Sequence, residues 1–172
     1  MRVIKSLESL THADAPRAGG KAYNCARLKQ AGFPVPDGFV LLAGASDGAL
    51  VAVELEEALR PFPEETLFAV RSSAADEDGA SHSFAGIHET RLNVTRDGLA
   101  QAIDACRASV ESAQALAYRR TQGLRTDRLE TGVLVQAMIR AVASGVAFTI
   151  NPLTGGREEL VISATWDWAK RW

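Results

Sequence analysis

Residues 67–94 read LFAVRSSAADEDGASHSFAGIHETRLNV, and this stretch is the most informative part of the sequence for the fold. It opens with Leu67–Arg71, a compact apolar run that predicts a buried strand. A polar loop rich in glycine and serine follows. In His88–Val94, polar and apolar residues then alternate, as they do in a half-buried strand. The stretch therefore predicts two strands joined by a long polar loop.

Predicted helices lie on both sides of this strand pair in the sequence. Downstream, Leu99–Ala117 has apolar residues at spacings of three and four, which predicts one amphipathic helix. Upstream, Asp47–Arg60 suits a helix with an apolar stripe, and two prolines end it. A further helix of about three turns is predicted to follow Gly19-Gly20-Lys21 and to stop at Gly32.

The remaining apolar runs predict four more strands: Gly38–Leu42, Val133–Ile139, Gly145–Ile150 and Leu160–Ala164. Short turns join the last three, which favours antiparallel pairing with helices packed against the sheet. We therefore predict an α+β fold. A chain of 172 residues can form one domain or two small lobes that share a core, and we place the lobe boundary near residues 61–66.

The overall composition is that of an ordinary globular protein, and the net charge of −2 gives no reason to expect nucleic acid or a membrane as a partner. No apolar run approaches the ~20 residues that cross a bilayer, and the N-terminus lacks the features of a secretory signal. We therefore expect a cytoplasmic protein. Cys25 and Cys106 belong to no metal-binding motif, and the simplest interpretation is two buried side chains in a reducing compartment.

Two cations are candidates for binding phosphate. Lys21 follows two glycines at a predicted helix start, where its ammonium group and the helix N-terminus both favour an anion. The alternative is a simple turn with a solvated lysine, because the P-loop pattern is absent. Arg71 ends an apolar strand, from which a guanidinium reaching into a cleft could grip a phosphate with two parallel hydrogen bonds. The alternative is an arginine at the rim, paired with Glu77 or Asp78.

The loop that follows this strand allows other interpretations. The acidic run Asp76–Asp78 suggests a metal site, but it lacks EF-hand spacing, so we favour a solvated acidic loop and predict no metal ligand. His82 and His88 belong to no Ser/His/Asp spacing, and we interpret both as ordinary loop or strand residues. The many small residues up to Gly86 favour a lid whose backbone amides fold over phosphates.

A polar residue interrupts the apolar strand VLVQAMI. We expect the Gln136 side chain to face a ligand cleft, and the backbone through Met138 to read the edge of a flat base. The alternative is a glutamine on an edge strand that faces water.

Three sequence blocks occur in the order of a known family: GGK with GFPVPDGFV, then FAVRSSAADEDGASHSFAGIHETRLNV, then VLVQAMIRAVASGVAFTINPLTG. Together they resemble the N-terminal ATP-binding domain shared by phosphoenolpyruvate synthases, pyruvate phosphate dikinases and rifampin phosphotransferases. The resemblance implies an ATP-grasp fold, with ATP between two lobes and Mg²⁺ neutralising its phosphates. It also implies a nucleotide site with phosphate contacts from Lys21 and Arg71, a lining from Gly86 and Thr90, and adenine contacts from Gln136 and Met138.

The resemblance also implies a reaction. In that family ATP is split into AMP and phosphate, and a phosphoryl group passes to a histidine on a separate domain. That histidine then phosphorylates pyruvate or a rifamycin hydroxyl, and cations on both sides of the transferred group stabilise its transition state. No histidine or substrate domain follows here, so we expect the chain to be inactive alone. Its partners would be ATP and separately encoded phosphohistidine and substrate domains.

The C-terminal tail departs from the family. After a strand like Ile162–Trp166 the family continues Gly-Leu-Gly-Glu-Ala-Val, whose glutamate serves the nucleotide and metal, whereas this chain ends WDWAKRW. The genetic code permits this tail to be written as TGG GAC TGG GCG AAG CGG TGG, and this choice of codons, read from the third base, encodes the family's six residues. We therefore expect a truncated domain with a frameshifted tail, and Mg²⁺ ligands beyond it. A subunit acting in trans and a non-catalytic nucleotide-binding module stay open as alternatives.

Overall fold

The computed structural model describes residues 2–74, 89–121 and 131–166. The chain divides into two compact units, Met1–Met138 and Ile139–Trp172. Residues 61–66 lie inside the first unit, where they connect a helix to a strand. A lobe boundary at residues 61–66 stays a prediction.

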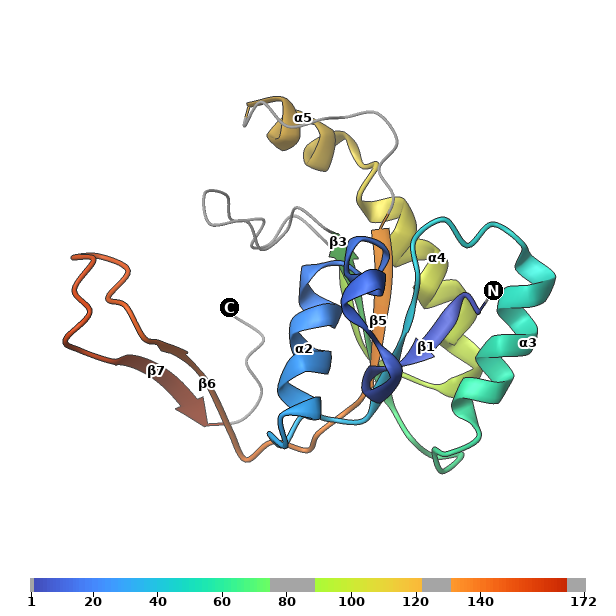
Figure 1. Ribbon diagram of the computed structural model, residues 1–172, viewed down its shortest axis with the longest axis horizontal. Coiled ribbons are helices and arrows are strands. Elements are labelled where there is room, and N and C mark those ends of the chain that lie inside the picture. The colour runs from blue at the N-terminus through green and yellow to red at the C-terminus, as the bar shows by residue number, and fades with distance from the viewer. Residues whose placement is uncertain (1, 75–88, 122–130, 167–172) are drawn as a thin grey trace. The chain divides into compact units, whose positions relative to one another are not determined.

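The first unit is built on one five-stranded sheet in the order β1-β2-β5-β3-β4 (Figure 1). Every neighbouring pair is antiparallel, which confirms the predicted α+β fold with an antiparallel sheet. The N-terminal strand was not predicted, because three residues are too few to show a periodicity. The strands are β1 Ile4–Ser6, β2 Gly38–Leu41, β3 Phe68–Ala74, β4 Thr90–Val94 and β5 Thr131–Ala137.

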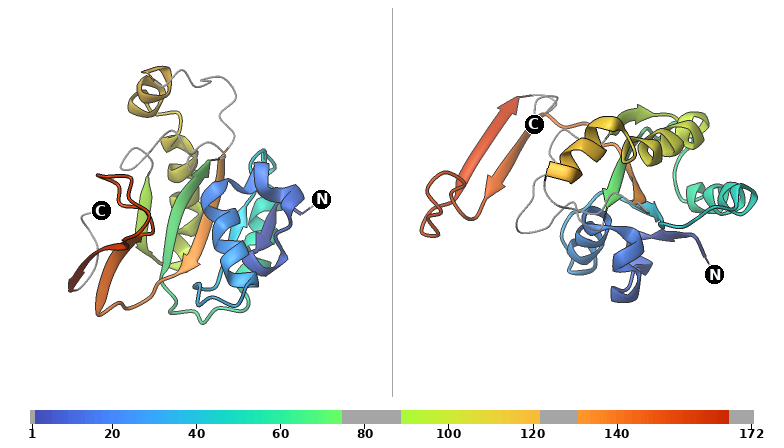
Figure 2. Two further views of the ribbon diagram at one scale, coloured as in Figure 1. Left: turned by 60° about the vertical axis from the view of Figure 1, so that its left-hand side comes forward. Right: turned by 90° about the horizontal axis from the view of Figure 1, so that it is seen from above.

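Helices cover both faces of this sheet. Figures 1 and 2 show α2 on one face and α4 on the other, with α3 beside β1. None of the described helices is both long and apolar enough to span a bilayer. The helices are α1 Ala15–Ala18, α2 Gly20–Gln30, α3 Gly48–Leu59, α4 Leu99–Ser109 and α5 Ala113–Thr121, with short 3₁₀ turns η1 Leu7–Ser9, η2 His12–Asp14 and η3 Arg96–Gly98.

The prediction of one helix over Leu99–Ala117 was wrong, because the chain forms α4 and α5 with a break between them. Two serines explain the break. The Ser109 hydroxyl donates to the Cys106 carbonyl at 2.8 Å near the end of α4, and the Ser112 hydroxyl accepts from the Ala115 amide at 3.2 Å to cap α5. Serine hydroxyls compete with the helical hydrogen bonds in this way, and the apolar spacing alone does not reveal it.

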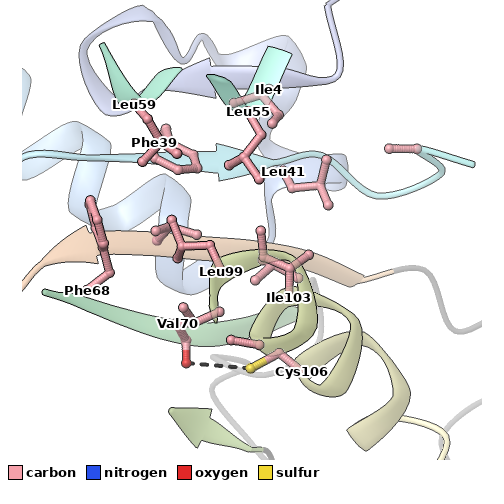
Figure 3. Close-up of a cluster of buried hydrophobic side chains, with 14 residues drawn as sticks. Ile4, Phe39, Leu41, Leu55, Leu59, Phe68, Val70, Leu99, Ile103 and Cys106 are labelled. Atoms are coloured by element: carbon pink, nitrogen blue, oxygen red, sulfur yellow. Dashed lines mark hydrogen bonds between the residues drawn. The ribbon is translucent and has the colours of Figure 1, made fainter. Parts of the chain in front are cut away.

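Each face of the sheet buries its own core. The larger core lies on the α4 face (Figure 3), and it consists of Ile4, Phe39, Leu41, Ala45, Leu55, Leu59, Phe68, Val70, Leu99, Ala102, Ile103, Cys106, Val133 and Val135. The smaller core lies on the α2 face and consists of Leu7, Leu10, Ala18, Ala22, Ala26, Val40, Leu42 and Leu134. Side chains alternate between the faces along each strand, so β2 and β5 contribute to both cores. The unit therefore has three layers, with helices on either side of the sheet.

The C-terminal end of α2 is fastened to the segment that leads out of β1. Gln30 Nε2 donates to three backbone carbonyls within residues 7–10, at 2.8–3.2 Å. Lys29 Nζ lies 2.6 Å from the Asp37 carboxylate and 3.2 Å from that of Glu8. The Asp37 hydrogen bond outweighs desolvation and, with Glu8, raises the pKa of Lys29. These contacts fix one end of the helix whose other end faces β3.

Cys106 is buried on the α4 face, where its thiol donates to the Val70 carbonyl at 3.5 Å (Figure 3). Burial raises the pKa of this thiol to about 11, and the nearby Glu89 carboxylate adds to the rise. The burial predicted for the cysteines is therefore confirmed for Cys106, whereas Cys25 is only partly buried against the smaller core.

The raised pKa of Cys106 predicts a pH-dependent stability. Because the folded pKa of about 11 exceeds the ordinary value of 9.0, the thiol stabilises the fold fully below pH 9.0, and this contribution is lost as the pH rises toward 11. The loss amounts to about 2–3 kcal/mol at most. Urea unfolding between pH 7 and 11 measures it. Cys106→Ala is expected to be less stable at neutral pH but to show a flatter decline, and parallel curves for the two proteins would contradict the assignment.

The second unit contains a two-stranded antiparallel ribbon, β6 Ala143–Phe148 and β7 Val161–Trp166, paired from Ala143↔Trp166 to Phe148↔Val161. The predicted strands over Gly145–Ile150 and Leu160–Ala164 are confirmed with shifted ends. In the connection, Asn151 Oδ1 accepts from the amides of Leu153 and Thr154, at 2.8 and 3.2 Å, which forms a turn of the kind that asparagine favours.

Candidate functional site

Arg71 lies on β3, on the sheet face that α2 covers. It pairs with Leu134 on β5, and Leu134 belongs to the smaller core beneath α2. Because directly opposed residues share a face, the Arg71 side chain leaves the sheet toward α2 and away from the larger core. The side chain is half-buried, and it makes no hydrogen bond or ion pair with any residue in the described part of the chain.

A bulge decides which residue of β4 faces Arg71. Phe68 pairs with Val94 but Val70 pairs with Arg91, so β4 uses one residue more than β3 between these points. Asn93, within this irregularity, has a φ of 56°. The extra residue places Thr90 opposite Arg71 and turns Arg91 to the other face, where its Nε lies 2.7 Å from the Glu89 carboxylate. One exposed hydroxyl and one cation therefore share the α2 face.

Lys21 approaches the same place from the first turn of α2. Its Nζ donates to the Ser72 carbonyl at 3.2 Å, next to Arg71 in β3. One residue further along the helix, the Ala22 amide donates to the Ser73 hydroxyl at 3.0 Å. The alternative of a simply solvated lysine does not describe this half-buried, hydrogen-bonded ammonium group. The positive end of the helix dipole and two cationic side chains thus lie along one stretch of β3.

Two glycines allow the α1–α2 junction to approach the sheet this closely. Gly19 has a φ of 80° and a ψ of 164°, and a Cβ on it would lie 1.8 Å from the Ser73 carbonyl oxygen. A Cβ on Gly132 would lie 2.5 Å from the Ala18 carbonyl oxygen. Neither glycine leaves room for a side chain, so the approach depends on both.

Gln136 lies on β5, the middle strand of the sheet, and only 8% of it is exposed. The alternative of a water-facing glutamine on an edge strand is therefore wrong. It pairs with Ala69 and so shares the face of Arg71, as a diagonal neighbour about 7–8 Å away. Its Nε2 donates weakly to the Pro36 carbonyl at 3.4 Å, and Gly38 packs against its side chain.

Met138 follows β5 and is the last residue of the first unit. Its amide donates to the Leu67 carbonyl at 2.8 Å, which continues the pairing of β5 with the β3 side. The structure therefore brings Lys21, Arg71, Thr90 and Gln136 to one face, with Met138 at the end of the strand that holds Gln136. Gly86, the acidic run Asp76–Asp78, His82 and His88 lie outside the described residues, and their predicted roles stay predictions.

The chemistry of this face suits an anion. Two cations and a helix N-terminus are present, and a half-buried position strengthens their interaction with a bound charge. Among the described residues, no group of three or more His, Cys, Asp or Glu side chains could hold a metal ion. The face is therefore suited to a phosphorylated ligand, and it offers no metal-binding cluster within the described ranges.

A cavity of about 860 Å³ occurs elsewhere in the first unit, between β1 and α3. The Glu54 carboxylate joins these two elements by accepting from the Val3 and Ile4 amides at 2.8 and 2.7 Å. Lys5, Phe39 and Phe62 are among its lining residues, and none of the predicted site residues lines it. Both acidic and basic side chains line it, so the cavity does not offer a lining of one charge to a ligand.

Two residues that shape the site, Ser73 and Gly132, were not predicted from the sequence. Ser73 lies two residues after Arg71, the end of the predicted strand, and the period of two along a strand places both on the same face. The signal was therefore present for Ser73. For Gly132 there was none, because only the approach of α1 distinguishes it from a glycine in an ordinary turn.

The fold and this face define an α+β domain with a cationic site suited to a phosphorylated ligand. The chain belongs to the pyruvate phosphate dikinase AMP/ATP-binding domain family, whose pattern matches residues 49–171. This confirms the predicted family and identifies an ATP-binding domain of the dikinase type. The match begins after Lys21, which is covered instead by relatives that align with 96% of the chain.

Several curated relatives are much longer proteins. The prodigiosin synthesizing transferase PigC of Serratia marcescens is 33% identical over 87% of this chain and 20% of its own length. A probable phosphoenolpyruvate synthase of Staphylothermus marinus is 30% identical over 96% of this chain and 26% of its own. An uncharacterized phosphotransferase, YvkC of Bacillus subtilis, is 30% identical over 87% and 21%. The chain thus spans between 20% and 26% of the length of these three relatives.

Proposed function

We propose that this chain is the ATP-grasp nucleotide-binding domain of a dikinase-type phosphotransferase. In this proposal ATP is split into AMP and phosphate, and a phosphoryl group passes to a histidine on another domain. The match to an AMP/ATP-binding domain and the relatives named as synthases and transferases support it. A cytoplasmic location, where ATP is abundant, and separate phosphohistidine and substrate domains as partners belong to the same proposal.

The observation that supports the proposal most strongly is the position of Arg71. Its guanidinium makes no ion pair in the described part of the chain and lies beside the Lys21 contact with β3. Burying a cation without a countercharge costs free energy, so a half-buried arginine with no ion pair among the described residues favours an anionic ligand. We assign phosphate contacts to Lys21 and Arg71, a lining role to Gly86 and Thr90, and adenine contacts to Gln136 and Met138.

Mg²⁺ would neutralise part of the triphosphate charge in such a site. The described residues on this face are cations, amides and a hydroxyl, and they do not form the carboxylate set that Mg²⁺ prefers. The proposed contacts of Lys21 and Arg71 are therefore direct contacts to phosphate oxygens, and Mg²⁺ has no ligand among them.

Arg71→Ala is expected to abolish the stabilisation of the chain by ATP. For the unchanged protein, ATP at 100 times its dissociation constant stabilises the fold by about 2.7 kcal/mol, which appears as a higher melting temperature. The variant loses the guanidinium that grips the phosphates and should melt at the same temperature with and without ATP. Measuring AMP in the same samples tells binding from hydrolysis.

Arg91→Ala is the matched control for this experiment. Arg91 is also an arginine of the β3–β4 pair, but it lies on the opposite face and pairs with Glu89. The control should keep the full ATP-dependent rise in melting temperature. Equal losses in the two variants, or a rise that survives in Arg71→Ala, would count against the proposed site.

A further inference from the structure

We infer that Ser73 is a positioning residue for nucleotide binding: it holds the first turn of α2 against β3 and thereby sets Lys21 beside Arg71. The inference rests on the proposed function. Ser73 is fully buried and lies on the same face as Arg71, two residues along β3. It would not touch the nucleotide and would act through the lysine.

The contact between Ser73 and α2 replaces an ordinary helix cap. Gly19, the N-cap residue of α2, has no side chain with which to satisfy the amides of the first turn. The Ser73 hydroxyl, 51 residues away in the sequence, accepts from the Ala22 amide at 3.0 Å. Ala22 is the third residue of the helix, where a capping side chain normally binds. A strand residue therefore performs the capping, and it couples the helix start to the sheet.

The neighbouring contacts show why this coupling sets Lys21. The Lys21 side chain donates to the carbonyl of Ser72, so Lys21 and the next residue, Ala22, both join the helix to the strand. The close approach of Gly19 to the Ser73 carbonyl leaves the helix start no freedom to move nearer. If the Ala22–Ser73 hydrogen bond is lost, the first turn can move away from β3, and Lys21 moves away from Arg71 with it.

Adjacent serines provide a matched pair of variants. Ser72 is as buried as Ser73, but its hydroxyl points to the other face of the sheet and has no hydrogen-bond partner among the described residues. Ser72→Ala removes the same atom from the same strand while it keeps the backbone carbonyl. The two variants thus differ in the hydrogen bond to α2 and in little else.

The test measures the dissociation constant of ATP by calorimetry for the full chain and its variants. Ser73→Ala is expected to bind about tenfold more weakly, the effect of losing one cap, whereas Ser72→Ala should stay within about twofold of the unchanged protein. In a double-mutant cycle, Ser73→Ala should add nothing to the effect of Lys21→Met, because it acts through that lysine. Additive losses would mean a general structural role and would overturn the inference.

A second measurement needs no ATP. The hydrogen exchange rate of the Ala22 amide, followed by NMR, should rise about tenfold in Ser73→Ala and stay unchanged in Ser72→Ala. An unchanged rate in Ser73→Ala would overturn the inference. If the unchanged protein binds no ATP, the proposed function fails, and the role of Ser73 in binding fails with it. If it binds ATP and Ser73→Ala binds equally well, only the inference fails.

Discussion

Gly19→Ala is expected to lower the free energy of unfolding by about 3–5 kcal/mol, a loss that threatens the fold of the whole first unit. Two costs add up. The backbone of Gly19, with a φ of 80° and a ψ of 164°, lies in a region that essentially only glycine occupies. A Cβ would also lie 1.8 Å from the Ser73 carbonyl oxygen, and this contact is with backbone that cannot turn aside. Urea unfolding monitored by circular dichroism measures the loss.

Gly32→Ala separates these two costs. Gly32 also has a positive φ, 84°, but a Cβ on it would meet nothing within 4 Å. This variant should therefore lose only about 1 kcal/mol, the cost of a left-handed conformation for a residue other than glycine. If both variants lost the same amount, the contact of Gly19 with β3 would contribute nothing, and the close seating of α2 on the sheet would be refuted.

Phe68→Ala is expected to cost about 3–5 kcal/mol, because it removes a buried ring from the larger core and leaves a cavity. Phe68 is 1% exposed, and its ring meets that of Phe62 edge to face, with the centroids 5.3 Å apart. Phe62 in turn lies 6.4 Å from Phe39, so the three rings form one cluster beneath β2 and β3. Guanidinium unfolding should show a lower midpoint with an unchanged slope.

Phe33→Ala makes the same chemical change at a position that is 59% exposed. It should change the free energy of unfolding by less than about 0.5 kcal/mol. Comparable losses for Phe33→Ala and Phe68→Ala would show that the rings of the larger core do not determine the stability of the sheet.

Much of the fold could be predicted from local patterns. The helices α2 and α3 begin and end within a few residues of the predicted positions, because glycine and proline stops and the Asp47 cap act on their immediate neighbours. The β2 and β5 strands were visible as apolar runs. The division between α4 and α5 was not, because it depends on the hydrogen bonds of two serine side chains and not on the apolar spacing.

The candidate site was predictable in its residues but not in its geometry. Lys21 and Arg71 were singled out because a cation beside two glycines, or at the end of an apolar strand, is unusual. That Thr90 rather than Arg91 faces Arg71 follows from the β4 bulge, and a shift of one residue reverses every side chain beyond it. The contact of either cation with ATP stays a prediction.

The sequence by itself determined most of the helices and strands, and it placed the chain in its family, because both depend on residues that are near one another along the chain. The tertiary structure decided that β5 lies in the middle of the sheet, which buries Gln136, and that α2 rests on β3 through Ser73. These features join residues 51 or more positions apart, such as Ala22 and Ser73. Their pairing is set by the packing of two cores against one sheet, and no local pattern of residues encodes it.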